Sequence, residues 1–98
     1  MSDRKEGQVV LVAFPHADYS KSKLRPALLI KKLPGIHGDW LLCAISTQLH
    51  HEIKEFDEVI GKSDQDFKSS GLKDKSLIRI SRLAVVNGNL LPGAIGEI

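Results

Sequence analysis

The sequence predicts a small, mainly β protein, folded as a strongly bent barrel or sandwich. Its apolar residues fall into short runs rich in β-branched side chains, and glycine or proline separates many of these runs. This pattern is typical of short strands joined by tight turns. The 98 residues are enough for one domain with a modest core, so a single domain over residues 1–98 is expected.

Six apolar runs are expected to form strands, and the sequence indicates where several of them begin or end. The first run follows Gly7 and stops at Pro15. The second begins at Pro26, because proline has no amide hydrogen to give to a ladder. The third, residues 40–45, is continuously apolar, which indicates burial on both faces. The expected strands are residues 8–14, 26–30, 40–45, 56–60, 76–86 and 94–98.

The segments between these strands leave one choice open. Residues 51–61 could form an amphipathic helix or an edge strand over 56–60, and the sequence favours the strand at the end of the segment. One helical turn is expected over residues 64–69, ended by Ser70-Gly71. Asn87-Gly88-Asn89 is a turn signal of the kind that hairpins use.

The net charge of +2 is too small to identify a nucleic-acid binder, so the distribution of charge matters more. Residues 20–32 and 68–82 are rich in lysine and arginine, and residues 52–66, between them, are acidic. If the two basic segments meet in the fold, they form a positive face opposite a negative one. The alternative, which charge alone favours, is a set of solvated strand edges.

Nothing in the sequence indicates export or a membrane. The first seven residues are polar and charged, unlike a signal peptide, and no apolar run reaches the length of a membrane span. Cys43 is the one cysteine, which excludes an intrachain disulfide, and its apolar neighbours predict a buried, inert thiol. We therefore expect a cytoplasmic protein.

Two short patterns indicate an anion site. Arg25 stands at the start of the second expected strand, and Ser46 follows the third. An arginine and a small hydroxyl held at strand ends by a packed sheet can bind a phosphate, because the guanidinium is a permanently charged, forked donor. The alternatives are structural: Arg25 could pair with Asp18 or with an acid of residues 52–66, and Ser46 could satisfy a backbone group.

A longer series of motifs runs along the chain in a consistent order. It consists of the Gly-led first strand, Arg25-Pro26, Ile45-Ser46-Thr47-Gln48, Phe67, Gly71-Leu72-Lys73, Ser76-Leu77-Ile78-Arg79 and Ile95-Gly96. From Gly7 to Ile98 the chain resembles the MazF/PemK toxins of bacterial toxin–antitoxin pairs. The resemblance implies a compact SH3-like β-barrel with one or two short helices, a homodimer, and ribosome-independent cleavage of single-stranded RNA. It also implies an acidic antitoxin that covers the RNA groove.

The resemblance assigns roles to particular residues. The arginine and the hydroxyl residue that act at the scissile phosphate correspond to Arg25 and Ser46, where the family usually has threonine. A functional histidine of some members corresponds to His16, a possible acid or base. The residues expected to contact RNA are Lys21, Lys23, Thr47, Gln48, Arg79 and Ser81.

Besides Ser46, two further departures from the family pattern bear on this expectation. Some members carry an acid two residues after the arginine that matches Arg79, and this chain has Ser81 there. Members usually continue into a helix after the strand of Ile95-Gly96, and this sequence stops at Ile98, which bears on the strength of the dimer.

The expected reaction uses neither a metal nor a cofactor. The 2′-hydroxyl attacks the adjacent phosphorus and a 5′-hydroxyl leaves, a route closed to DNA. Arg25 would hold the phosphate with Ser46 as its partner, and because Arg25 stays protonated near neutral pH, His16 is the candidate general base. His50-His51-Glu52 is not interpreted as a metal site, because neighbours on a strand face opposite sides and no Cys or Asp cluster completes a shell.

Two alternatives keep the fold and change the function. One is a DNA-gyrase inhibitor that resembles CcdB, whose gyrase contact depends on a tryptophan in a C-terminal helix. The only tryptophan here is Trp40, expected in the core or a dimer contact, and this argues against that alternative. The other is a catalytically weak or inactive barrel that binds RNA or an antitoxin, and the departures at Ser46 and Ser81 keep it open.

Overall fold

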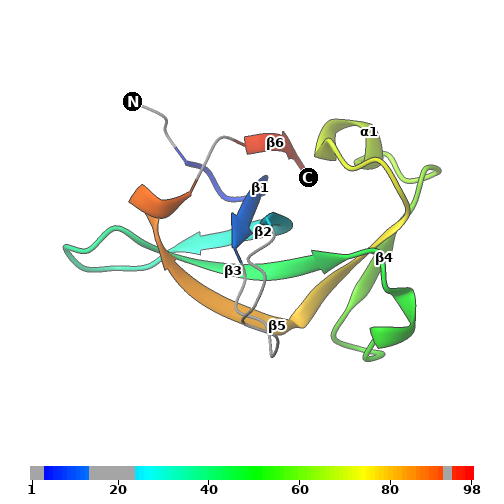
Figure 1. Cartoon of the computed structure of the whole chain (residues 1–98), viewed down its shortest axis with the longest axis horizontal. Coiled ribbons are helices and arrows are strands. Elements are labelled where there is room, and N and C mark those ends of the chain that lie inside the picture. Colours follow the sequence, from blue (N-terminus) through cyan, green and yellow to red (C-terminus); the bar gives the residue numbers. More distant parts are fainter. Residues whose placement is uncertain (1–3, 14–23, 92–93) are drawn as a thin grey trace.

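The computed structural model describes residues 4–13, 24–91 and 94–98. Within them, six strands form one antiparallel sheet in the order β4-β5-β3-β2-β1-β6, which curls into a half-barrel with a short helix beside β6 (Figure 1). The mainly β, SH3-like architecture predicted from the sequence is therefore confirmed. The elements are β1 (Gln8–Ala13), β2 (Leu24–Lys32), β3 (Asp39–Ser46), η1 (Leu49–His51), β4 (Glu58–Ile60), α1 (Phe67–Ser70), β5 (Ser76–Asn87), η2 (Gly88–Leu90) and β6 (Ala94–Glu97).

All six expected strands are present, with shifts at their ends. β2 begins at Leu24, so the prediction that this strand begins at Pro26 is wrong. At the start of β2, the ladder with β3 begins with the pair Ala27 and Ala44. Pro26 lies before this pair, so it pairs with β1 alone. An edge position of this kind tolerates the missing amide hydrogen of proline.

β3 lies inside the sheet and is buried on both faces, as its continuous apolar run predicts. Alternate residues of a strand face opposite sides, and Leu42 and Cys43, both 0% exposed, belong to different core clusters. Trp40 belongs to the same cluster as Leu42, which places it in the core. Burial raises the pKa of the Cys43 thiol to about 11, and the prediction of a buried thiol is confirmed. The first cluster is Val10, Val12, Ala27, Leu29, Trp40, Leu42 and Leu91, and the second is Val9, Cys43, Ile45, Ile60, Phe67 and Ile78.

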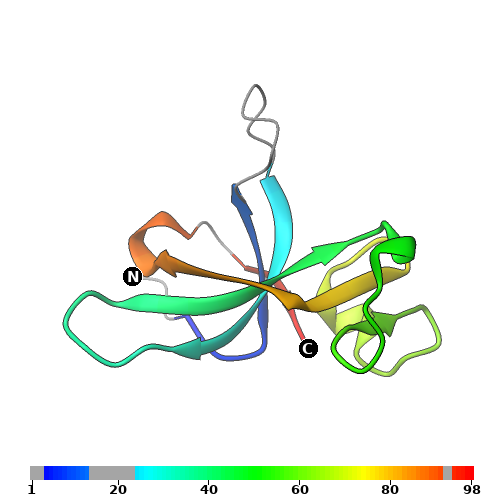
Figure 2. The ribbon, with the colours of Figure 1, turned by 90° about the horizontal axis from the view of Figure 1, so that it is seen from below.

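A bulge divides β5 into two halves. Leu83 pairs with Cys43 of β3, whereas the next residue of β3, Ala44, pairs with Arg79. The three residues between Arg79 and Leu83 therefore have no partner in β3, and the strand bends there (Figures 1 and 2). The half before the bulge also pairs with β4, whereas the half after it has β3 as its one ladder partner among the described residues.

Two glycines allow α1 and β6 to approach each other closely. α1 ends at Gly71, whose φ of 77° lies in the left-handed region that glycine adopts readily. A Cβ on Gly71 would collide with the backbone of Ile95, and a Cβ on Gly96 would collide with the backbone of Ser70. The helical turn expected over residues 64–69 is present but begins three residues later, at Phe67, and Gly71 ends it as predicted.

The turn expected at Asn87-Gly88-Asn89 is present, but it does not close a hairpin. The chain forms the 3-10 turn η2 there, and β6 pairs with β1 instead of β5. Asn87 uses its side chain for this turn: its Oδ1 accepts a hydrogen bond from the amide of Asn89 at 2.9 Å, and its Nδ2 donates one to the carbonyl oxygen of His37 at 2.7 Å.

Between β3 and β5 the strand interpretation is confirmed and the helix alternative is wrong. The strand covers only Glu58–Ile60, because residues 54–56 form a turn before it. In the described part of the chain, every helix is too short to cross a bilayer.

Candidate active site

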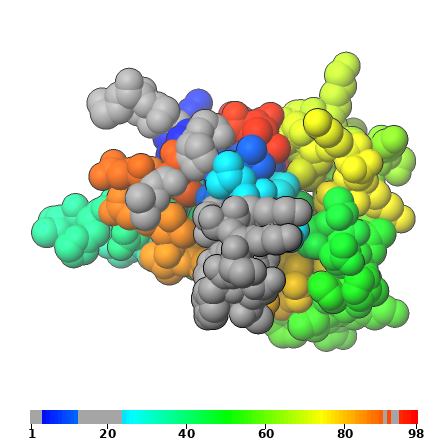
Figure 3. Space-filling view, in the orientation of Figure 1, coloured from blue at the N-terminus to red at the C-terminus, as the bar shows by residue number. Residues whose placement is uncertain are grey.

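Arg25 and Ser46 stand at the same end of two neighbouring strands. Arg25 pairs with Val12 of β1, and its side chain is exposed. Arg25 and Ser46 each lie two residues beyond Ala27 and Ala44, the outermost pair of the β2–β3 ladder. The ladder between β2 and β3 ends at this pair, and Figure 2 shows the start of β2 (cyan) and the end of β3 (green) pointing in different directions. The start of β2 (cyan) and the segment between β3 and β4 (green) reach the same face of the molecule (Figure 3).

The Ser46 hydroxyl already has a structural role. Its Oγ accepts a hydrogen bond from the backbone amide of Gln48 at 3.0 Å, which is the backbone contact considered as the alternative to function. A hydroxyl that accepts a hydrogen bond keeps its own hydrogen as a donor. Ser46 can therefore hold the turn and still donate to a phosphate oxygen. Thr47 and Gln48 are exposed beside it.

Arg79 lies on the same side of the sheet as Ser46. It pairs with Ala44 of β3, and residues directly opposite each other in an antiparallel pair share a side, as do alternate residues along a strand. Its side chain is half-buried, and its Nε is buried with no hydrogen-bond partner among the described residues. The register thus brings Ser46 and Arg79 to one side of neighbouring strands.

Next to Arg79 lies a buried carboxylate that the sequence did not single out. Asp57 is 6% exposed. Its Oδ1 accepts hydrogen bonds from the amide of Ser81 at 2.9 Å and from the Ser81 hydroxyl at 2.8 Å, and its Oδ2 accepts one from the amide of Ile53 at 2.9 Å. Burial alone would raise the pKa of Asp57, but these hydrogen bonds and the nearby charge of Arg79 lower it below its ordinary value. Asp57 is therefore an anion at neutral pH.

His50 and His51 lie on a 3-10 turn and not on a strand, so the expectation that they face opposite sides is wrong. Their rings meet edge to face with centroids 4.2 Å apart. Loss of hydration and the positive charges of His50, Arg79 and Arg82 lower the pKa of His51. His51 is consequently neutral near pH 7. Among the residues described, no three His, Cys, Asp or Glu side chains come close enough together to hold a metal ion.

Three residues expected at the site lie outside the described part of the chain. They are His16, Lys21 and Lys23. The remaining predicted residues fall into two groups. Ser46, Thr47, Gln48 and Arg79 lie around the end of β3, with Arg25 at the neighbouring end of β2. Ser81 lies in the bulge of β5, where it contacts Asp57 and not the end of β3.

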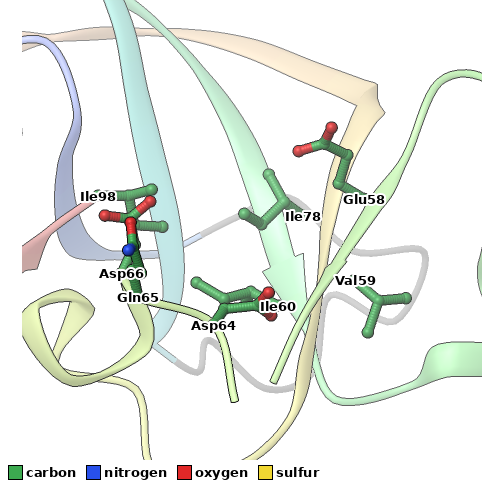
Figure 4. Close-up of a pocket in the computed structure, with 8 residues that line it drawn as sticks. All are labelled: Glu58, Val59, Ile60, Asp64, Gln65, Asp66, Ile78 and Ile98. Atoms are coloured by element: carbon green, nitrogen blue, oxygen red, sulfur yellow. The ribbon is translucent and has the colours of Figure 1, made fainter. Parts of the chain in front are cut away.

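A separate pocket of about 340 Å³ lies between β4 and the segment before α1 (Figure 4). Three carboxylates, from Glu58, Asp64 and Asp66, line it together with apolar side chains. Ile98, Gln65 and Asp66 stand on one side in Figure 4, and Glu58 stands on the other. Like charges repel, so this pocket is unsuited to the phosphate groups of RNA.

The curled antiparallel sheet, with arginines and a hydroxyl at one end of its inner strands, defines a small SH3-like barrel with a candidate anion site. The profile of the family described as the PemK-like, MazF-like toxin of type II toxin–antitoxin systems matches residues 5–98. The chain therefore belongs to this family of toxins, and the resemblance found in the sequence is confirmed. No individual curated protein matches the chain.

Proposed function

We propose that this chain is a toxin endoribonuclease, a single domain over residues 1–98 that cleaves single-stranded RNA without a metal ion. Membership of the toxin family supports this function. The observation that carries the assignment of the site is the placement of Arg25 and Ser46 two residues beyond the same ladder pair, with Arg79 on the side of Ser46.

In the proposed reaction, a ribose 2′-hydroxyl attacks the adjacent phosphorus. Negative charge builds on the phosphoryl oxygens as the bond to the leaving 5′-oxygen breaks, and the products are a 2′,3′-cyclic phosphate and a 5′-hydroxyl. Arg25 binds the phosphate and stabilises the developing charge, Ser46 donates a hydrogen bond, and Arg79 contacts the substrate. A preorganised donor of this kind contributes about 3–4 kcal/mol to lowering a barrier, judged from oxyanion holes.

The proton of the 2′-hydroxyl needs an acceptor other than arginine, which stays protonated near neutral pH. We propose His16 for this role, as the family resemblance implies. His51 is the matched comparison, because it is also a histidine near the basic groups and is neutral near pH 7. His16→Ala is expected to slow cleavage more than His51→Ala does. The reverse order would assign the proton transfer to His51.

The family also implies partners. We propose that the toxin is a homodimer and that an acidic antitoxin covers the RNA site. Sedimentation of the purified chain tests the first point, and loss of cleavage on adding the antitoxin tests the second. The gyrase-directed alternative finds no support, because Trp40, the only tryptophan, is 6% exposed and lies in the core.

The test is incubation of the purified protein with a long single-stranded RNA in EDTA. Lys32→Ala is the matched control for Arg25→Ala, because Lys32 is an exposed basic residue at the other end of β2. We expect discrete fragments from the wild type and from Lys32→Ala, and a large loss of cleavage in Arg25→Ala. Equal cleavage by all three folded proteins would remove Arg25 from the site. The absence of cleavage by the folded wild type would favour the binding-only alternative.

A further inference from the structure

The bulge of β5 determines which side of the sheet Arg79 faces. Beyond the bulge, Leu83 pairs with Cys43. If β5 continued in that register, Arg79 would lie opposite Thr47 and would share the side of Ile45, away from Ser46. The bulge shifts the register by three residues, an odd number, so Arg79 pairs with Ala44 and shares the side of Ser46.

A bulge leaves backbone groups without ladder partners, and such groups bond instead to side chains or to water. Ser81 is the central residue of the three that have no partner in β3. Its amide donates to Asp57 Oδ1 at 2.9 Å, and its hydroxyl donates to Oδ1 at 2.8 Å and lies 3.1 Å from Oδ2. Asp57 thus supplies the acceptor that β3 does not supply to the Ser81 amide.

Asp57 is itself firmly held. Its side chain is 6% exposed, and Oδ2 accepts a hydrogen bond from the amide of Ile53 at 2.9 Å, which closes the turn before β4. The carboxylate therefore joins that turn to the bulge of β5. The structure gives no hydrogen bond between Asp57 and the buried Nε of Arg79, so any effect on Arg79 must pass through Ser81 or through charge.

We propose that Asp57 is a positioning residue for RNA cleavage: by anchoring Ser81 it maintains the bulge that keeps Arg79 on the side of Ser46. This inference rests on the proposed ribonuclease function. It also gives a physical meaning to Ser81, which stands where some family members have an acid. In this chain the carboxylate near Arg79 comes instead from Asp57, 24 positions before Ser81.

The test uses Asp57→Asn, which keeps the size of the side chain but removes its charge and one acceptor oxygen. Glu55→Gln is the matched control, since Glu55 is an exposed acid in the same segment. We expect Asp57→Asn to lower kcat by up to about 100-fold, because a small displacement of a group in an active site can reduce the rate by about this factor. Glu55→Gln should leave kcat unchanged.

A double-variant cycle separates positioning from general damage to the fold. In an Arg79→Ala background, Asp57→Asn should cause little further loss of cleavage, because its effect passes through the missing arginine. If the losses from Asp57→Asn and Arg79→Ala multiply fully, Asp57 does not act through Arg79 and the inference is wrong.

A measurement without RNA keeps this inference separate from the proposed function. The Nε–Hε resonance of Arg79, followed by NMR, should shift in Asp57→Asn and stay in place in Glu55→Gln. Ser81→Ala keeps the hydrogen bond from the backbone amide to Asp57 and loses only the hydroxyl contacts, so it should give a smaller shift. It is the variant to use if Asp57→Asn does not fold. An unmoved Arg79 resonance in a folded variant would overturn the inference. If the wild type fails to cleave RNA but Asp57→Asn still shifts the Arg79 resonance, only the proposed ribonuclease function is overturned.

Discussion

The two halves of β5 pair with the same strand but are held in different ways. Before the bulge, Leu77 is 0% exposed and β5 lies between β3 and β4. After the bulge, Leu83 and Val85 are 52% and 55% exposed, and β3 is the one ladder partner in the described structure. The first half is held by packing, and at the bend between the halves Ser81 donates hydrogen bonds to Asp57. We therefore expect substitutions in the packed half to act on stability, and substitutions of Asp57 to act on both stability and the placement of Arg79.

The largest effect expected from this difference is on stability. Leu77→Ala should lower the free energy of unfolding by about 2–5 kcal/mol, because it leaves a cavity where a buried side chain packed. Leu83→Ala, the same substitution in the exposed half, should change it by no more than about 0.5 kcal/mol. Urea unfolding measures both. Similar losses of unfolding free energy in the two variants would mean that the half of β5 after the bulge is buried in solution.

The anchor between the halves should also contribute to stability, in a way that depends on pH. Asp57→Asn should cost about 1–3 kcal/mol at pH 7, because it weakens buried hydrogen bonds to Ser81 and Ile53. The pKa of Asp57 is lowered from 3.8 in the folded protein. The carboxylate therefore stabilises the fold above pH 3.8 and loses this effect as the pH falls through the folded pKa.

The check is urea unfolding of the wild type and Asp57→Asn at pH 7 and at successively lower pH. The gap between the two proteins should narrow below pH 3.8. A gap that stays constant or widens on acidification would show that the charge of Asp57 is not what stabilises the bend.

The buried thiol of Cys43, at the centre of the sheet, should not react with reagents in the native protein. Burial raises the pKa of Cys43 from 9.0 to about 11, so the folded protein keeps the unreactive thiol form at pH 8. A thiol reagent should label Cys43 only in denaturant. Rapid labelling of the native protein would mean that β3 opens more easily than its double-sided burial implies.

The smallest effect concerns His51. Its pKa is lowered by loss of hydration and by the charges of His50, Arg79 and Arg82. Arg82→Gln removes one of these charges and should raise the pKa of His51, because less positive charge then opposes its protonation. An NMR titration of the His51 ring measures the change, and a drop in the pKa would contradict the placement of Arg82 near His51.

The sequence predicts the barrel well because its signals are local. The continuous run over residues 40–45 revealed a strand buried on both faces, and Gly71 marked the end of α1. The site is harder to predict because its geometry depends on long-range pairing. Nothing local distinguishes Asp57 from the other acids of residues 52–66, and no residue type marks a shift of three in the β3–β5 register.

The turn at residues 87–89 illustrates the same limit. Its turn-forming residues were recognised correctly, but they cannot tell whether the next strand returns to β5 or crosses to β1. In the structure β6 pairs with β1 and also packs against α1, where Gly71 and Gly96 allow a close approach.

The measurement that tests RNA cleavage most directly is an end-group analysis with a modified substrate. The cleavage position is first mapped on a long single-stranded RNA in EDTA, and the RNA is then remade with one 2′-deoxy nucleotide on the 5′ side of that position. We expect the unmodified RNA to give 2′,3′-cyclic phosphate and 5′-hydroxyl ends, and the modified RNA to resist cleavage there. Cleavage of the modified RNA at the same bond would contradict attack by the 2′-hydroxyl.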